Sequence, residues 1–323
     1  MDRKYVTETV LADAAGIARA AQILRDGGLV AVPTETVYGL AARADDEAAV
    51  ARIFAAKGRP RFNPLIVHVA DMDAAEELVT MDDRARALAT RFWPGPLTLV
   101  LPRRPDARLA SAIHAGLPTL AVRCPAHPAM RAVLEEVRVP LAAPSANASE
   151  TVSPTSAAHV LATLDGRIDA VLDAGATERG LESTIAALRD DGGWSLLREG
   201  PITREELEPL LGADETFQGG IEAPGQLARH YAPGKPMRLD ARKAAADEFL
   251  IGYGDVAGDV MLSGPADLSE AARNLYACLH LAAASPKSRI AVAPVPDEGV
   301  GRAINDRLRR AAAAPDANQS SGS

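Results

Sequence analysis

Short runs of apolar residues alternate along the chain with longer segments in which apolar residues recur every three or four positions. The short runs are typical of buried strands and the longer segments of amphipathic helices. In the first 211 residues, strands are predicted at 29–32, 65–69, 97–101, 119–123, 140–143, 170–175, 183–188 and 194–198. Helices are predicted at 13–26, 50–57, 84–92, 153–164 and from 203 onward. Because hairpin-like pairs interrupt the alternation of strand and helix, we expect an α/β fold with a mixed sheet.

Two of the predicted helices begin with capping signals. Ser153 followed by Pro154 fits an N-cap before a proline in the first helical position. Thr203-x-x-Glu206 has the spacing of a capping box, in which the side chain of each residue accepts a hydrogen bond from the backbone N–H of the other.

A break in the periodicity divides the chain. Residues 212–236 are rich in Gly and Pro and are predicted to be a linker. A second α/β pattern follows over 237–313, with strands at 237–240, 249–252, 260–263 and 289–293 and helices at 268–283 and 300–313. The polar tail 314–323 is expected to be disordered. We therefore predict a first domain over 1–211, a linker and a smaller second domain.

Composition agrees with two globular domains. The chain has 323 residues, of which 47% are hydrophobic and only 4% aromatic, so its cores must consist mainly of Ala, Val and Leu. No apolar run approaches the ~20 residues of a membrane helix, and the charged start resembles no secretory signal. Cys124 and Cys278 lack a C-x-x-C partner, which favours a reducing compartment over a structural zinc site. We expect a cytoplasmic protein.

The charge is unevenly distributed. A net charge of −8 argues against a protein whose main task is to hold nucleic acid. Residues 51–70, however, contain Arg52, Lys57, Arg59 and Arg61 and no acidic residue. Such a patch on an acidic protein suggests a small anionic ligand. The alternative is that these cations only stabilise the C-terminus of a helix.

Several common motifs are absent or misplaced. GYGDVA (252–257) fits a dinucleotide-binding fingerprint, but a strand rather than a helix is predicted after it. The chain has no Walker A motif, no H-E-x-x-H pair and no G-x-S-x-G turn. Nicotinamide, P-loop, zinc-protease and serine-hydrolase chemistry are therefore not expected.

Three polar stretches stand next to predicted strands: KGRPRFNPLIVH (57–68), PSAN (144–147) and LESTI (181–185). PSAN directly follows a strand, and open α/β sheets bind ligands at that end of their strands. Each also has a purely structural interpretation. Asn147 could form a turn, Ser183 could be a hydroxyl at a strand edge, and His68 could be a half-buried ring with its hydrogen bonds satisfied.

Taken in order and spacing, these stretches and two others resemble the YrdC-like domain of threonylcarbamoyl-AMP synthases: VPTETVYGLAA (32–42), KGRPRFNPLIVH, APSANASE (143–150), LESTI and LLREG (196–200). APGQLARHYAP (223–233) and the α/β segment after it are similar to the linker and C-terminal domain of the two-domain members. The resemblance implies a YrdC-like twisted mixed sheet flanked by helices, followed by a smaller Rossmann-like α/β domain.

The resemblance also implies an activity. Members of this family make L-threonylcarbamoyladenylate from L-threonine, bicarbonate or CO2 and ATP, and release pyrophosphate. Other enzymes then transfer the threonylcarbamoyl group to an adenosine of tRNA. With this division of labour the protein itself need not bind tRNA tightly, and no membrane partner is expected.

The family's site residues fall on positions of this sequence. Those that contact ATP in the family match Lys57, Arg59, Asn63, Thr119, Ser145, Asn147, Ser153 and Arg198. Those around threonine match Thr36, His68, Arg123, Ser183 and the backbone of Ala143. No metal ligand from the protein is implied, so Mg²⁺ is expected to arrive with ATP.

The implied chemistry fits these residue types. A carbamate formed on the threonine amine must attack the α-phosphate, and because both groups are anionic, cations and hydrogen-bond donors must offset their repulsion. Arg123 can form a bidentate pair with the threonine carboxylate. Neither the formation of the carbamate nor its attack on the α-phosphate requires a covalent nucleophile from the protein.

The linker is expected to do more than connect two domains. APGQLARHYAP places Arg229, His230 and Tyr231 between two prolines. We predict that this segment folds over the pocket as a lid that excludes water, with Tyr231 near the nucleotide. On that hypothesis Tyr231→Ala weakens ATP use and leaves thermal stability nearly unchanged. The alternative is that the three side chains dock the second domain onto the first.

Two other functions stay open from the sequence. An RNA-binding module of the YrdC-like type would need an extended basic face, and only one short patch is present. A different enzyme on a related fold is also conceivable. A sugar-phosphate lyase would need an acidic metal-binding loop, and a carbamoyltransferase maturation factor would need zinc-finger segments with many cysteines, which two cysteines exclude.

Overall fold

The computed structural model describes residues 6–60, 62–214, 220, 222–226 and 230–313. The chain divides into two compact units. One comprises residues 1–149 and 153–226, and the other residues 150–152 and 227–323. The division at Gln226 and Leu227 falls inside the segment expected as a linker, and the exact domain limits stay a prediction. The tail 314–323 and Arg229 lie outside the described residues.

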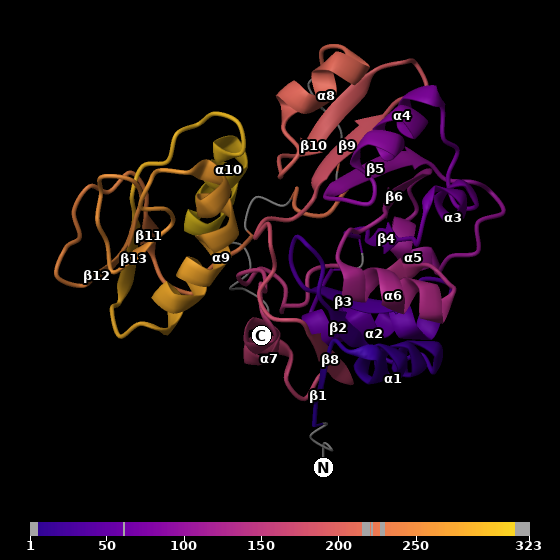
Figure 1. The fold of residues 1–323 in the computed structure, drawn as a ribbon, viewed down its shortest axis with the longest axis horizontal. Coiled ribbons are helices and arrows are strands. Elements are labelled where there is room, and N and C mark those ends of the chain that lie inside the picture. The colour runs from indigo at the N-terminus through magenta and orange to yellow at the C-terminus, as the bar shows by residue number, and fades with distance from the viewer. Residues whose placement is uncertain (1–5, 61, 215–219, 221, 227–229, 314–323) are drawn as a thin grey trace, which may run out of the picture. The chain divides into compact units, whose positions relative to one another are not determined.

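A mixed sheet forms the centre of the larger unit (Figure 1). In the described residues its strands lie in the spatial order β1 (Glu8–Leu11), β8 (Ala170–Asp173), β2 (Val30–Val32), β3 (Gly39–Arg43), β7 (Leu141–Ala142), β4 (Ile66–His68), β6 (Thr119–Arg123), β5 (Leu97–Pro102), β9 (Thr184–Leu188) and β10 (Trp194–Arg198). The sheet combines parallel pairs, such as β4 with β6, and antiparallel pairs, such as β5 with β6. The expected mixed α/β fold is confirmed.

The helices of this unit divide between the two faces of the sheet. One face packs against α2 (Glu47–Lys57), α3 (Met72–Glu76), α4 (Asp83–Phe92), α5 (Ser111–His114), α7 (Ala157–Leu164) and α8 (Arg204–Leu211). The other face packs, over β2, β3 and β7, against α1 (Ala14–Arg25) and α6 (Pro128–Val137). The large core therefore lies on the first face.

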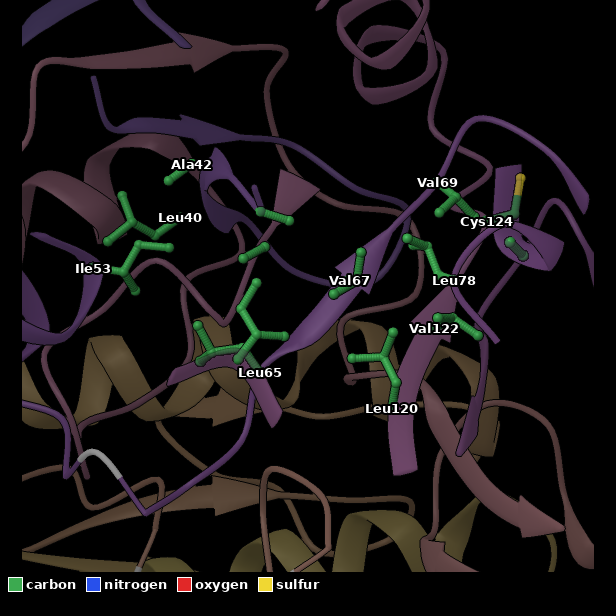
Figure 2. Close-up of a cluster of buried hydrophobic side chains, with 14 of the residues drawn as sticks. Leu40, Ala42, Ile53, Leu65, Val67, Val69, Leu78, Leu120, Val122 and Cys124 are labelled. Carbon is green, nitrogen blue, oxygen red and sulfur yellow. The ribbon is translucent and has the colours of Figure 1, made fainter. Parts of the chain in front are cut away.

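Strand side chains alternate between these faces because successive residues of a strand point in opposite directions. Leu65 and Val67 from the chain around β4, and Leu120 and Val122 from β6, are buried in the large core (Figure 2). Residues at the intervening positions of β4 and β6 point to the second face. There Ile66 and Ala121 belong to a smaller apolar cluster whose other members are Val100, Ile185, Ala187, Leu197 and Ala223. Apart from Ala223, this cluster consists of strand residues.

Local signals explain several element ends, but α7 begins later than its sequence predicts. The capping box of Thr203 and Glu206 is present at the start of α8, as predicted. The predicted N-cap at Ser153 is wrong, because α7 begins after Ser156, whose hydroxyl accepts a hydrogen bond from the backbone N–H of His159. Ser153 is instead fully buried and donates to Glu182. A serine can cap a helix or hold a distant carboxylate, and local sequence cannot distinguish these roles.

The pattern of apolar residues also missed some elements of the larger unit. These are β1, β3, α3, α5 and α6, within the described residues. The strand β3 reads GLAAR and is buried on both faces, so its sequence shows no alternation of apolar and polar residues.

The smaller unit is a separate α/β sheet. Its parallel strands, in the part of the chain that the structure describes, lie in the order β11 (Met237–Arg238), β14 (Arg289–Val292), β12 (Glu248–Gly252) and β13 (Val260–Met261). The helices α9 (Leu268–Ala284) and α10 (Gly301–Ala312) lie on the same side of this sheet and contact each other (Figure 1). The expected smaller α/β domain is confirmed.

The glycine-rich turn after β12 has a packing explanation. A Cβ atom on Gly252 would lie 2.3 Å from the carbonyl oxygen of Val256. The turn leads into β13 and not into a helix, so it lacks the helix N-terminus with which a dinucleotide fingerprint binds pyrophosphate. Within the described residues, no helix is long and apolar enough to cross a membrane.

Candidate active site

Polar side chains interrupt the second face of the sheet where β4, β6, β5 and β9 meet. The pairing of β4 with β6 places His68 directly beside Arg123 at the ends of the two strands. Thr98 of β5 and Ser183, which precedes β9, share this face because each lies two residues before a member of the small apolar cluster. All four side chains are at least 96% buried.

Arg123 is held by three partners. Its Nε donates to the carbonyl oxygen of Gly95 at 3.1 Å, and one terminal nitrogen donates to the hydroxyl of Thr36 at 3.0 Å. The other terminal nitrogen lies 2.5 Å from Oε1 of Glu35 in a buried ion pair. The hydroxyl of Thr36 is itself hydrogen-bonded to the hydroxyl of Thr34, with 2.7 Å between the oxygens. The loop that carries the threonines therefore fixes the orientation of the guanidinium.

Glu35 is the counter-charge of this arginine. Burial alone would raise the pKa of its carboxyl, but the charge and hydrogen bond of Arg123 and a backbone N–H from Ala126 together hold the pKa below its ordinary value. The carboxylate thus stays ionised at neutral pH. Removal of one partner of such a pair would leave the other charge buried and uncompensated, which costs about 3–5 kcal/mol.

His68 is a neutral ring at physiological pH. Burial, and secondly the charge of Arg123, lower its pKa to about 3. Its Nδ1 is buried and has no hydrogen-bond partner among the described residues. Because a buried polar atom without a partner costs roughly 1–3 kcal/mol, this atom is suited to a hydrogen bond with a ligand.

A β-bulge directs Arg198 to the same region. Ser195 pairs with Ala187 and Leu196 with Ala186, but Arg198 rather than residue 197 pairs with Ile185. The extra residue re-aims the side chains that follow it. Arg198 therefore reaches Ser183, donating to its carbonyl and its hydroxyl, both at 3.0 Å. The Ser183 hydroxyl also lies 2.7 Å from that of Thr98.

A buried lysine organises the PSAN loop. The ammonium group of Lys57, at the end of α2, donates to the carbonyl oxygens of Ser145 at 2.6 Å and of Asn147 at 2.5 Å. Burial, and secondly the charge of Arg59, hold the pKa of Lys57 well below its ordinary value. Lys57, Ser145 and Asn147, predicted from separate motifs, thus lie together.

Arg59 joins this cluster to Arg198. It donates to the carbonyl oxygens of Asn63 at 3.3 Å and Pro64 at 2.9 Å. Burial, and secondly repulsion from Arg198, lower its pKa to about 10. Repulsion thus links Arg59 to both Lys57 and Arg198, and a bound anion would relieve it. Asn63 is also buried, and its Oδ1 has no partner among the described residues.

The remaining predicted residues are Ala143, Thr119 and Ser153, and not all of them lie beside the groups described above. Ala143 is buried directly after β7, and its N–H donates to the carbonyl of Ile66 on β4. Thr119 begins β6 and so lies at the opposite end of that strand from Arg123. Ser153 donates to Glu182 at 2.5 Å, beside Ser183 in the chain.

Residues 222–226 of the expected linker pack on the larger unit. Ala223 is fully buried in the small apolar cluster with Ile66 and Ala121. The carbonyl oxygen of Pro224 accepts a hydrogen bond from Arg198 at 3.3 Å, and Glu222 pairs with Arg189 at 2.7 Å. Residues 222–226 therefore cover part of the face that carries the site.

Tyr231 belongs to the smaller unit. Its ring is 1% exposed, stacks on Tyr276 with 5.5 Å between centroids and lies 5.5 Å from the Arg307 guanidinium carbon. The expectation that Tyr231→Ala leaves stability nearly unchanged is therefore wrong, because it would remove a large buried side chain. Its placement near the nucleotide stays a prediction.

Comparisons with known proteins identify the family. Residues 22–200 match the family model described as "Telomere recombination", and residues 202–313 match the model of the C-terminal domain of threonylcarbamoyl-AMP synthase. A threonylcarbamoyl-AMP synthase of Bacillus subtilis is 40% identical over 95% of this chain and 96% of its own length. This chain belongs to the threonylcarbamoyl-AMP synthase family.

Solved structures of the family share the fold. A crystal structure of Pyrococcus abyssi Sua5 complexed with L-threonine has a TM-score of 0.85 and 37% identity, covering 95% of this chain and 97% of that one. A variant of the same protein, with a histidine and a tyrosine replaced by alanine, also has a TM-score of 0.85. Escherichia coli YciO matches 61% of this chain with a TM-score of 0.53 and 22% identity, which shows the fold of the larger unit.

Inspection of the family's motifs overlooked four groups that the structure brings to the site: Glu35, the Gly95 carbonyl, Thr98 and Glu182. Glu35 offered one signal, since it stands inside the polar stretch PTETVYG. A buried arginine needs a counter-charge, but its identity depends on which loop lies opposite. No sequence signal distinguishes Thr98 from other strand threonines.

The pKa of His68 leads to a prediction about stability. The unfolded ring takes up a proton below its ordinary pKa of 6.5, whereas the folded ring does so only near pH 3. The contribution of His68 to the free energy of unfolding is therefore fully present above pH 6.5. It is lost as the pH falls toward 3, by up to about 1.4 kcal/mol per pH unit. His68→Gln should remove that part of the slope in urea unfolding measured between pH 7 and 4. Parallel curves for the two proteins would contradict the assignment.

Proposed function

We propose that this site synthesises L-threonylcarbamoyladenylate from L-threonine, bicarbonate or CO2 and ATP, releasing pyrophosphate by adenylyl transfer. Membership of the family supports the activity. The structural observation that supports it best is the arrangement of cationic side chains, of which Lys57, Arg123 and Arg198 are buried. Lys57, Arg59 and Arg198 form a cluster suited to a polyanion, while Arg123 is held separately by Glu35 and Thr36.

The cation cluster would bind the nucleotide. Lys57 and Arg59 repel each other's charge, as do Arg59 and Arg198, so phosphate oxygens would stabilise all three. Hydroxyl and amide groups of the same region would supply further donors and acceptors. We assign to ATP binding Lys57, Arg59, Asn63, Thr119, Ser145, Asn147, Ser153 and Arg198.

The Arg123 region would bind L-threonine. A guanidinium pairs with a carboxylate through two parallel hydrogen bonds. The orphan Nδ1 of His68, beside Arg123, is placed to meet a polar group of the same substrate. We assign to the threonine pocket Thr36, His68, Arg123, Ser183 and the backbone of Ala143. Pyrococcus abyssi Sua5, which was crystallised with L-threonine, supports an amino-acid pocket on this fold.

The reaction needs positioning and charge compensation. The threonine amine adds to CO2 to give a carbamate, whose oxygen attacks the α-phosphorus while the bond to pyrophosphate breaks. The two reactants are anions, and the cation cluster would offset their repulsion in a site largely shielded from water. Mg²⁺ bound to the triphosphate would neutralise further charge. In the described residues no group of three or more acidic, His or Cys side chains could hold a metal, and the donors of the cation cluster suit phosphate oxygens.

The product would pass to other enzymes, which transfer the threonylcarbamoyl group to tRNA. With a net charge of −8, the chain is suited to a reaction on small molecules without tight tRNA binding. Cys124 and Cys278 are free thiols, which supports a reducing compartment such as the cytoplasm. We retain the proposal that the segment around Tyr231 limits the loss of the labile intermediates to water.

The substrate requirement tests the function directly. Pyrophosphate release, followed with a coupled colour assay, should require ATP, bicarbonate and L-threonine together. L-alanine should support it poorly. Equal release without any amino acid, or equal stimulation by alanine, would overturn the proposed reaction.

Arg59 tests the cation cluster. Arg59→Ala should weaken ATP use by roughly 2–5 kcal/mol if its phosphate contact is desolvated. Arg108→Ala is the matched control, because Arg108 is an exposed arginine on another loop. Steady-state kinetics at varied ATP concentrations give kcat/KM for ATP in the two variants. Similar losses in the two variants would mean that the cluster is not the nucleotide site.

Two truncations separate the parts of the linker. A chain ending at Gln226 keeps Ala223 and Pro224 on the larger unit, and a chain ending at Leu211 loses them. We expect the shorter chain to be less stable and to use ATP less well, since the small apolar cluster and Arg198 are then exposed. Both should lose product to hydrolysis faster than the full chain does. Full rate and undiminished product yield in the Gln226 truncation would exclude a lid beyond that residue.

A further inference from the structure

We infer that Glu35 is the positioning residue that prepares Arg123 for the carboxylate of the amino-acid substrate. It would thereby make the site selective for amino acids with a free α-carboxylate. This inference rests on the proposed function and extends it to a residue outside the assigned threonine and ATP sets. The observation behind it is the buried contact of Glu35, Arg123 and Thr36.

The hydrogen bonds of Arg123 leave a defined place for a ligand. A guanidinium has five N–H donors. Three are used within the described residues, on Nε toward Gly95, on one terminal nitrogen toward Thr36 and on the other toward Glu35. One N–H on each terminal nitrogen stays for a ligand, and a carboxylate can accept from two such donors at once. The protein therefore presents a pair of donors, not a single charge.

Glu35 is itself fixed, which makes it able to orient another group. Its Oε1 contacts Arg123 at 2.5 Å, and its Oε2 accepts from the backbone N–H of Ala126 at 3.0 Å. The side chain is 3% exposed, so it has little freedom to turn. A long arginine side chain placed in this way loses less conformational entropy when the substrate binds.

The ion pair of Glu35 and Arg123 also affects how the site discriminates between possible ligands. Because the charge of Glu35 offsets that of Arg123, the pair attracts anions in general less than a lone arginine would. Selectivity must then come from the geometry of the two remaining N–H groups. A substrate analogue without a carboxylate would leave buried donors unpaired, which a polar site penalises strongly.

Glu35→Gln is the test, because an amide has one oxygen acceptor where Glu35 uses two. The substrates compared are L-threonine and L-threoninol, which replaces the carboxylate with a hydroxymethyl group. We expect the KM for threonine to rise about 10- to 100-fold, with kcat and the KM for ATP nearly unchanged. The preference for threonine over threoninol in kcat/KM should fall by about tenfold or more. Glu35→Asp should recover part of it.

Glu47→Gln is the matched control. Glu47 also accepts a hydrogen bond from a backbone N–H, that of Ser111 at 2.6 Å, but it is exposed on α2. This variant should keep the wild-type preference. If Glu35→Gln weakened threonine and threoninol equally, or changed neither, the positioning role would be overturned.

A binding measurement separates this inference from the proposed reaction. Calorimetric titration of L-threonine into the full chain, without ATP, needs no turnover. Weaker threonine binding in folded Glu35→Gln than in wild type would support the positioning role even if no pyrophosphate were released. Equal threonine binding in the two proteins would overturn it even if the reaction proceeded as proposed.

Discussion

Alternation of strand side chains between two faces is the constraint on which this structure depends. On β4 and β6, every second residue is buried under helices, and the residues between them face a region lined mainly by strands. The same two strands can therefore supply Val67 and Val122 to the core and His68 and Arg123 to the site. A shift of one residue in pairing would exchange the two sets. The core thus holds the site in register.

Burial of charge is the second organising effect. Lys57, Arg123 and Arg198 are each less than 10% exposed, which is costly without hydrogen bonds or opposite charge. Lys57 is compensated by backbone carbonyls and Arg123 by a carboxylate. This difference gives the two buried cations different chemical environments. On the proposed function, the backbone carbonyls hold Lys57 ready for a phosphate, and the ion pair of Arg123 with Glu35 limits which anions can bind.

The linker contributes to both units. Ala223 completes an apolar cluster of the larger unit, while Tyr231 packs on aromatic and cationic groups of the smaller one. The segment is therefore anchored at both ends by burial, unlike a flexible Gly/Ser spacer. This burial explains why its sequence contains a large aromatic residue, Tyr231.

The sequence by itself determined the α/β class and most strands, because these follow from local periodicity, and its resemblance to a family pointed to Lys57, Arg59 and Arg198 as candidate ligand-binding residues. The turn after β12 was also interpreted correctly, since a strand follows it. Only the tertiary structure decided the partners. Glu35 meets Arg123, which lies 88 positions away along the chain, Ser153 binds Glu182 instead of capping α7, and a bulge turns Arg198 toward Ser183. Such pairings depend on which loops the sheet brings together. A local sequence pattern contains no information about contacts between residues that are far apart in the chain.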